Sequence, residues 1–312
     1  FAPGERLVAG KHLWESIGVA IPAERGLPTY TWGLCSSCGR YHQQIGEAED
    51  LTACSECGGS VPVLGVAMIP VFGFIGIEAG QKLGESRPAR RARTEQFFGS
   101  FAGQAPSFAH TDGLAKRVST RQSSQGRVVV INRGPLDRHY YSCEWCGFTQ
   151  RPPDRGSRFP TDHTDARAPG RRKCRGTLRP RDLAHEYLTD VLEMNIERAG
   201  LPLAAGISAV EALIAAAPRI GIEPAELSGV CSLAGADLRI TLFDTVPGGA
   251  GHAKRISQSL PELVARANEL VASCTCGIDS SCYACLQSFR NQRVHDSLTR
   301  GGALAVLGLF LA

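Results

Sequence analysis

Cysteine is the residue type whose spacing in this chain most clearly indicates chemistry. Eleven of the twelve cysteines fall into three clusters, each built around short Cys-x-x-Cys or Cys-x-Cys pairs. The clusters contain Cys35, Cys38, Cys54 and Cys57, then Cys143, Cys146 and Cys174, and finally Cys274, Cys276, Cys282 and Cys285. Two thiolates on one tight turn point to a common centre, and a second turn can complete a tetrahedral shell. The spacing therefore predicts about three Zn²⁺ ions per chain.

A disulfide framework is the alternative, because an even number of cysteines in a small secreted domain favours bridges. This chain has 312 residues, and we find no signal-peptide pattern in it. A glycine directly follows a cluster cysteine at four places, as tight zinc-binding turns often require, namely Gly39, Gly58, Gly147 and Gly277. We therefore expect zinc rather than disulfides, and a reduced, cytoplasmic setting.

The second cluster contains only three cysteines. His163 lies between its two halves and is the predicted fourth ligand, because a neutral imidazole can complete a shell of three thiolates. His185 and a water molecule are the alternatives. Cys231, the one cysteine outside the clusters, lies in an apolar stretch and is expected to behave as a small buried hydrophobic residue.

Charge is distributed unevenly along the chain. The formal net charge is +4, but two four-cysteine zinc sites would each contribute −2 and a Cys₃His site −1, which gives 4 − 5 = −1. Residues 1–181 contain 25 Lys and Arg against 16 Asp and Glu, whereas residues 182–312 contain 9 against 14. The excess of basic residues in the front half therefore indicates nucleic-acid contact, whereas the net charge of the whole chain does not.

Two arginine-rich stretches are candidates for contact with DNA phosphates. Arg90, Arg91 and Arg93 belong to the first, and Arg171 and Arg172 to the second. Guanidinium groups pair well with phosphate oxygens, although solvated loops have the same composition. A third candidate set follows the last cysteine cluster, on an expected helix over residues 283–295, and comprises Arg290, Asn291 and Gln292. These side chains could instead hydrogen-bond to the backbone around the metal.

Hydrophobic patterning predicts an α+β fold with a β-rich front and a mixed α/β back. We expect a zinc ribbon with flanking strands at 1–75, a β-rich basic region with the second zinc site at 76–181, and an α/β zinc-binding domain at 182–312. In the middle part, 78–110 is expected to be irregular, and 117–122 to form a hairpin with 127–132. The back is expected to have strands at 189–196 and within 228–243, and helices at 206–217, 250–259, 261–273 and 302–312. No apolar run approaches the roughly 20 residues that span a bilayer, so we expect no membrane contact.

A glycine-rich segment separates the last predicted strand from the helices that follow. Gly248, Gly249, Gly251 and His252 could present backbone N–H groups to an anion, or the segment could simply be a tight turn. It lacks the Lys-Ser/Thr pair of a nucleotide-binding P-loop. We find no ATPase motif and assign no catalytic residue.

The motifs of the back half carry a family resemblance. Residues 183–194 (LAHEYLTDVLEM), 244–252 (DTVPGGAGH) and 281–295 (SCYACLQSFRNQRVH) resemble the zinc-binding C-terminal domain of MrfA-like superfamily 2 DNA helicases, a domain also found in the DISARM phage-defence protein DrmB. The resemblance implies that Cys274, Cys276, Cys282 and Cys285 are zinc ligands of an accessory module.

The expected function is assistance to DNA binding or unwinding, in repair or defence, with a helicase motor on the same polypeptide or on a partner. The chain begins at Phe1 without an initiator Met, so we expect part of a longer or processed polypeptide. A DrmB-like subunit acting with a separate helicase is the first alternative. A zinc-stabilised scaffold for protein interaction is the second.

Overall fold

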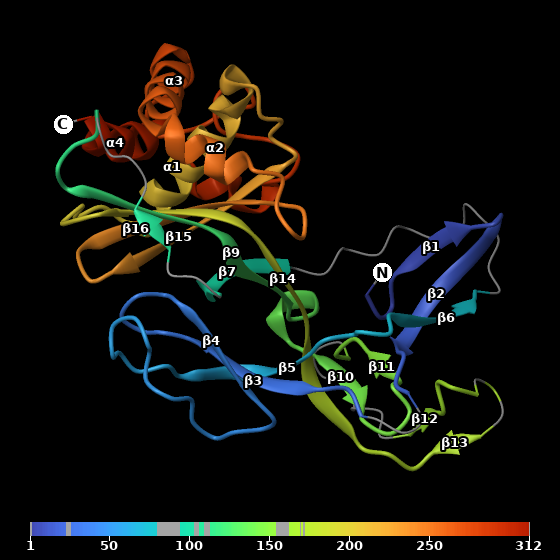
Figure 1. Cartoon of the computed structure of the whole chain (residues 1–312). Coiled ribbons are helices and arrows are strands. Elements are labelled where there is room, and N and C mark those ends of the chain that lie inside the picture. Colours follow the sequence, from blue (N-terminus) through green and yellow to red (C-terminus); the bar gives the residue numbers. More distant parts are fainter. Residues whose placement is uncertain are drawn as a thin grey trace.

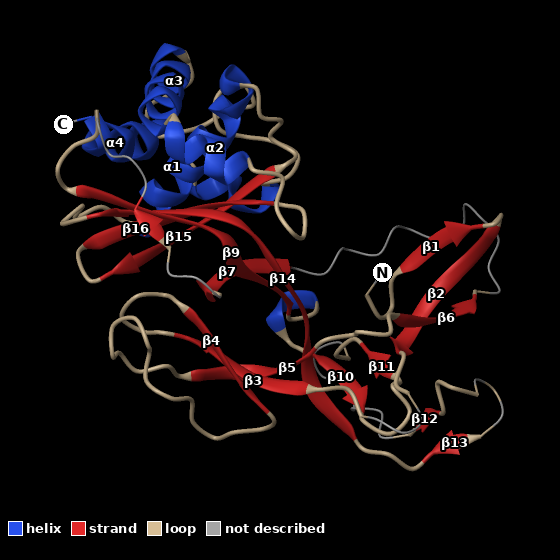
Figure 2. Ribbon diagram, in the orientation of Figure 1, coloured by secondary structure: helices blue, strands red, loops and turns tan. Residues whose placement is uncertain are grey.

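The computed structural model describes residues 2–22, 26–79, 94–102, 106–108, 113–153, 162–168, 170 and 172–311. Strands dominate the front of this described part, and helices gather at the back, where they cover one end of the largest sheet (Figures 1 and 2). The predicted α+β class, with its β-rich N-terminal part, is confirmed.

One long strand, β14 (Leu178–Ile196), connects the front of the molecule with the back. Its first residues pair with β10 (Tyr140–Cys143), and the next two pair in parallel with β5 (Val63–Met68). Further along, it pairs antiparallel with β9 (Val118–Asn132) on one edge and with β16 (Asp237–Asp244) on the other. A single strand therefore joins β10, which ends at Cys143, to strands of both the front and the back of the molecule.

The other strands of the described part complete three sheets. The 11-stranded sheet also contains β3 (Thr29–Leu34), β4 (Tyr41–Ile45), β7 (Thr94–Phe101), β8 (Ser107–Phe108), β11 (Thr149–Gln150) and β15 (Leu227–Ala234). A second sheet consists of β1 (Arg6–Ala9), β2 (His12–Val19) and β6 (Phe74–Glu78), and a small one of β12 (His163–Thr164) and β13 (Lys173–Cys174).

The main hydrophobic core lies between the back of the large sheet and its helices. These helices are α1 (Leu203–Ala216), α2 (His252–Gln258), α3 (Leu260–Ser273) and α4 (Arg300–Leu311). The described part also has short 3₁₀ turns at η1 (Pro135–Asp137), η2 (Ala217–Ile220) and η3 (Gln292–Ser297). Leu192, Met194 and Ile196 alternate along β14 and face this core. Val191 points to the opposite face and packs with Phe98 and Val128. Both faces of β14 are therefore buried near its end, where Glu193 and Asn195 alternate with the apolar residues.

Two predictions for the front half were wrong. The expected hairpin is one continuous strand, β9, because β14 pairs with its whole length and β7 and β8 pair on its other edge. Gly126 marks no turn: a Cβ there would lie 2.2 Å from Cγ1 of Val191, so glycine makes room for that side chain. Residues 94–101, within the stretch expected to be irregular, form β7.

The back half agrees better with the sequence. The two strands expected within 228–243 are β15 and β16, and the predicted helices correspond to α1, α2, α3 and α4. The helix expected over 283–295 does not form. Turns and η3 occupy this stretch, because the backbone bends around the third cysteine cluster.

One apolar stretch is long enough to span a bilayer, although the sequence analysis identified none. Leu203–Ile220 is 18 residues long with a mean hydropathy of 1.5, which satisfies the length and composition of a spanning helix. In the fold its first part, α1, packs against α3, α4 and β15. This helix is therefore a core helix in the structure.

The expected domain boundaries both fall inside strands. Position 75/76 lies within β6, and position 181/182 lies within β14. Neither position is a linker, because hydrogen-bonded ladders continue across both. The division into three functional parts remains a proposal.

Candidate metal centres

The first cysteine cluster is formed by two tight turns. One turn follows β3 and carries Cys35 and Cys38, and the other carries Cys54 and Cys57. Each turn closes through a hydrogen bond, from Gly39 N–H to the Cys35 oxygen (2.9 Å) and from Gly58 N–H to the Cys54 oxygen (2.8 Å). The φ angles of the two glycines are +66° and +70°, which explains why glycine follows each pair. The four sulfur atoms lie within 4.8 Å of one another.

The sulfur separations distinguish a metal site from disulfides. Sulfurs bound tetrahedrally to zinc at about 2.3 Å lie about 3.8 Å apart, whereas a disulfide requires about 2.05 Å. The Sγ atoms of Cys35 and Cys57 are 3.5 Å apart, and those of Cys38 and Cys54 are 3.6 Å apart. In the third cluster, the Cys282 and Cys285 sulfurs are 3.8 Å apart. The described cysteines are all free, and the clusters suit zinc.

His163 joins the three cysteines of the second cluster. The pairing of β12 with β13 places it opposite Cys174, and one of its ring nitrogens lies within 4.8 Å of the three sulfurs. It is only 6% exposed, and neither ring nitrogen has a hydrogen-bond partner in the described part. A buried imidazole without a partner is costly, and a metal bond would satisfy it. The alternative ligand, His185, lies on β14 and stacks on Tyr187 instead.

The third cluster lies between the end of α3 and the start of α4. Its four sulfurs, those of Cys274, Cys276, Cys282 and Cys285, also lie within 4.8 Å of one another. Arg300, the first residue of α4, donates to the carbonyl oxygens of Val271 (3.0 Å), Ala272 (3.2 Å) and Cys276. The sequence analysis missed this arginine, which ties both helices to the metal-binding loop.

Thiol acidity differs sharply within a cluster. A hydrogen bond with Cys146 lowers the pKa of Cys143 to about 7, and the same contact raises the pKa of Cys146 to about 12. Burial raises the pKa of Cys38 and of Cys285 to about 12. One thiolate therefore forms readily while its neighbours keep their protons, and zinc binding must release those protons.

Comparison with known proteins finds a family model that matches the segment containing the third cluster. Residues 209–286 match the family model of the MrfA Zn-binding domain. This MrfA-type segment begins within α1 and ends one residue after Cys285, so it contains all four cysteines of the third cluster. The resemblance predicted from the sequence is confirmed.

Two further similarities concern longer stretches. The chain is 26% identical to Druantia protein DruE of Escherichia coli (strain UMEA 4076-1) over 345 aligned positions, which cover 96% of this chain and 18% of that protein. It therefore spans less than a fifth of this relative. The crystal structure of the DUF1998 helicase MrfA bound to DNA matches with 15% identity and a TM-score of 0.38, over 70% of this chain and 25% of that one.

The glycine-rich loop of the MrfA-type segment is internally satisfied. Asp244 accepts N–H groups of Ala250 (2.6 Å), His252 (3.0 Å) and Ala253 (2.8 Å), and Asp190 accepts that of Gly251 (3.0 Å). The remaining two loop N–H groups also have partners: Gly248 donates to the Leu188 oxygen and Gly249 to the Val246 oxygen. Of the two interpretations that the sequence leaves open, these contacts favour the tight turn, in which the chain's own buried carboxylates take the place of an external anion.

The residues predicted to contact DNA differ in their position and exposure. Arg90, Arg91, Arg93 and Arg171 lie outside the described residues, whereas Arg172 is exposed. Just beyond the MrfA-type segment, Asn291 is buried and donates to Glu211 (2.7 Å) and to the Leu286 oxygen (2.7 Å). Arg290 donates to the Ala225 oxygen (2.9 Å), and Gln292 is exposed. Asn291 therefore has the structural role given as the alternative to DNA contact, because its hydrogen bonds hold the loop after the third cluster.

A buried ion cluster connects the first metal centre to β14. Arg40, two residues after Cys38, has a nitrogen 2.8 Å from a carboxylate oxygen of Glu193, and both side chains are 4% exposed. Arg121 on β9 also donates to Glu193 (3.0 Å) and to Glu56 (3.1 Å), which lies between Cys54 and Cys57. The sequence analysis missed this cluster, although both Arg40 and Glu56 adjoin cluster cysteines.

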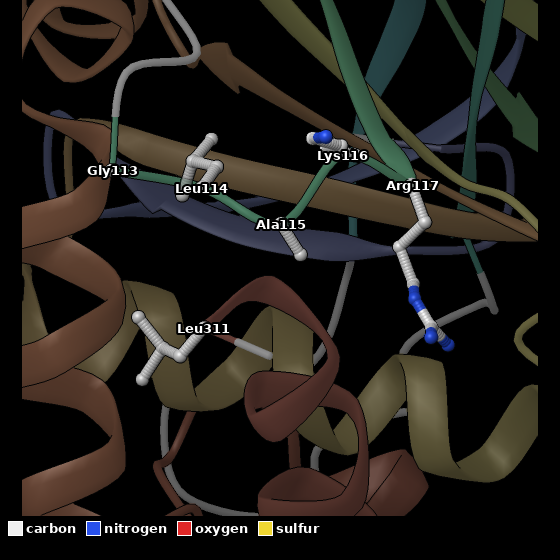
Figure 3. A pocket seen from close by; sticks show the side chains of 6 residues that line it. All are labelled: Gly113, Leu114, Ala115, Lys116, Arg117 and Leu311. Carbon is white, nitrogen blue, oxygen red and sulfur yellow. The ribbon is translucent and has the colours of Figure 1, made fainter.

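A hollow of about 580 Å³ lies between the start of β9 and the end of α4. Figure 3 shows its lining residues, and the two polar ones, Lys116 and Arg117, point in different directions. Binding sites usually contain polar groups that converge on a ligand. This hollow therefore offers no recognisable ligand site.

Proposed function

We propose that this region is a zinc-stabilised accessory part of a superfamily 2 DNA helicase, which guides or grips DNA for the motor. The match of residues 209–286 to the MrfA Zn-binding domain carries the proposal, because the four cysteines of that segment are already gathered for one ion. Druantia protein DruE is long enough to carry further domains beside the aligned 18%, and a motor on the same polypeptide is part of this proposal.

Zinc has a structural role in this proposal. Two four-cysteine sites and one Cys₃His site leave no protein-free coordination position, which distinguishes structural zinc from catalytic zinc. The proposed ligands are the eleven clustered cysteines and His163. At the first centre the ion would hold together turns with little hydrophobic core of their own, since Val61 is the one buried residue of that small cluster that is not a ligand cysteine.

The biological setting is part of the proposal. The similarity to Druantia protein DruE supports phage defence over DNA repair. A DrmB-like subunit that acts with a separate helicase remains the alternative, and it would require the motor to bind in trans.

DNA binding by the zinc-loaded chain tests the proposal. Fluorescence anisotropy with single-stranded and duplex probes should show binding that weakens about 100-fold between roughly 50 and 200 mM salt, as expected for about four phosphate contacts. Neutralising Arg90, Arg91 and Arg93, or Arg171 and Arg172, tests the two stretches that the sequence predicts. Arg266→Ala, on the exposed side of α3, is the matched control.

A scaffold for protein contact is the second candidate function. Ile278, Tyr283 and Phe289 are more than half exposed around the third cluster, with Phe289 at 75%. Exposed apolar groups gathered on one loop favour contact with another protein surface. Absence of DNA binding at low salt, together with binding of a purified motor domain that Phe289→Ser abolishes, would replace DNA gripping by this function.

A further inference from the structure

We infer that Trp145, on the second metal-binding turn, is a stacking platform for a base of a single-stranded polynucleotide. The inference rests on the proposed function and specifies its substrate class. Trp145 is 70% exposed, whereas Trp32 is 1% exposed in the core. A large aromatic ring is an expensive residue to leave in water, and it is common where one of its faces binds a ligand.

The indole stands on a rigid support. Cys143 and Cys146, on either side of it, are fully buried, and Gly147 N–H donates to the Cys143 oxygen (2.9 Å). The carbonyl oxygen of Gly147 then accepts the N–H of Val19 at the end of β2 (2.8 Å). The turn is therefore fastened to a neighbouring sheet as well as to the metal site. A base that stacks on this ring would lose little free energy to ordering the protein.

Arginines lie on the chain segment next to Trp145. A Cβ on Gly176 would lie 3.0 Å from Cβ of Trp145, so the backbone next to Arg175 passes close to the base of the indole side chain. Arg175 is exposed and has no ion-pair partner among the residues that the structure describes. Arg172 is also exposed on this loop, and Arg179 pairs opposite Ser142 in the ladder of β10 and β14. Arginine beside an exposed aromatic ring suits a base with its phosphate.

The acidic groups nearby are already matched by cations. Glu144 lies 3.8 Å from Arg179 and also contacts Arg181. Asp162 is 3.3 Å from Lys173 in an exposed pair. Asp165 pairs with Arg167 (3.0 Å), and Arg172 also acts on that carboxylate. Arg175 has no ion-pair partner among the described residues, and such an arginine next to this turn favours an anionic ligand.

A single strand fits this geometry better than a duplex. The bases of a duplex are stacked on one another, so only a terminal pair could reach an isolated indole. Unpaired bases present a free face, and base stacking on an aromatic ring tolerates any sequence. Deoxyribose and ribose strands share this chemistry, so both are used as probes.

Tryptophan fluorescence of the zinc-loaded 312-residue chain tests the inference. Trp14→Phe removes the other partly exposed indole, so the emission then comes from Trp145 and from the buried Trp32, which a bound base cannot reach. Titration with a 15-mer of deoxythymidine or of uridine should quench this emission, and a duplex of the same length should not. Trp145→Ala should weaken single-strand binding about 10- to 100-fold, and Trp145→Phe should restore most of it. Arg175→Ala should weaken binding as well, and Arg266→Ala should not.

The outcomes separate this inference from the function on which it rests. If DNA binding is salt-sensitive but does not quench the fluorescence, or if Trp145→Ala binds DNA as tightly as the unaltered chain, the stacking site is overturned. The proposed accessory function remains intact in either case. Equal quenching by the duplex also overturns it. Failure of the unaltered chain to bind any DNA at low salt overturns the accessory function. Zinc content of the variants is measured in parallel, so that lost binding is not confused with a lost metal site.

Discussion

At the scale of single residues, His163 makes the sharpest prediction. Both of its ring nitrogens are buried without a hydrogen-bond partner in the described part, and one of them lies within 4.8 Å of three sulfur atoms. His163→Ala removes one of four ligands, so the zinc content should fall from about three ions per chain to about two. The zinc affinity of the second site should fall by more than the roughly 10- to 100-fold that is typical when a residue outside the ligand shell is removed. Elemental analysis after dialysis against a mild chelator measures this.

Two variants control for an effect on folding alone. His163→Cys supplies a thiolate at the same place and should retain the ion. His185→Ala changes the histidine that stacks on Tyr187 and should leave zinc content unchanged. Loss of zinc in His185→Ala with retention in His163→Ala would assign the ligand to His185 instead.

At the scale of elements, the buried ion cluster decides how the first zinc turn meets the large sheet. Arg40 comes from that turn, and Glu193 from β14. Glu193→Gln keeps the shape but leaves Arg40 buried with only Glu56, 3.5 Å away, as its anion. Because an uncompensated buried charge is costly, the free energy of unfolding should fall by about 3 kcal/mol in urea denaturation.

An exposed ion pair is the matched control for this variant. Glu269 lies 3.2 Å from Arg219, and both side chains are well exposed. Glu269→Gln should change the free energy of unfolding by no more than about 1 kcal/mol. Equal effects of the two variants would show that burial of the Arg40 cluster contributes nothing special.

At the scale of the whole molecule, the three centres make stability depend on pH through zinc. The most acidic thiols, such as Cys143, have a pKa of about 7, and others, such as Cys146, have one of about 12. Zinc requires thiolates, so a falling pH favours the protonated, metal-free state. Because each centre must release two or more protons, the apparent dissociation constant should rise at least about 100-fold for each unit by which the pH falls.

Competition with a chromophoric chelator at two pH values measures this dependence. The unfolding midpoint should fall in parallel as the ions leave, most of all for the first two centres, whose turns belong only to small apolar clusters. Zinc affinity that does not change with pH would show that the thiols are already ionised in the metal-free protein.

The sequence by itself determined the local features. Each Cys-x-x-Cys-Gly turn is specified by five adjacent residues, so the sequence grouped the same twelve side chains that the structure brings together. Strands β15 and β16 and helices α1 and α3 were likewise visible, because their apolar periodicity is encoded within each segment.

Only the tertiary structure decided which distant segments meet. The run before Gly126 looked like one arm of a hairpin, yet β14 pairs with it over its whole length. The glycine-rich loop looked open to an anion, yet Asp244 and Asp190 reach it from two strands. Arg40 pairs with Glu193, which lies about 150 positions further along the chain. Such contacts depend on partners that are remote in sequence, and hydrogen-bond and charge satisfaction selects those partners only when the chain is folded.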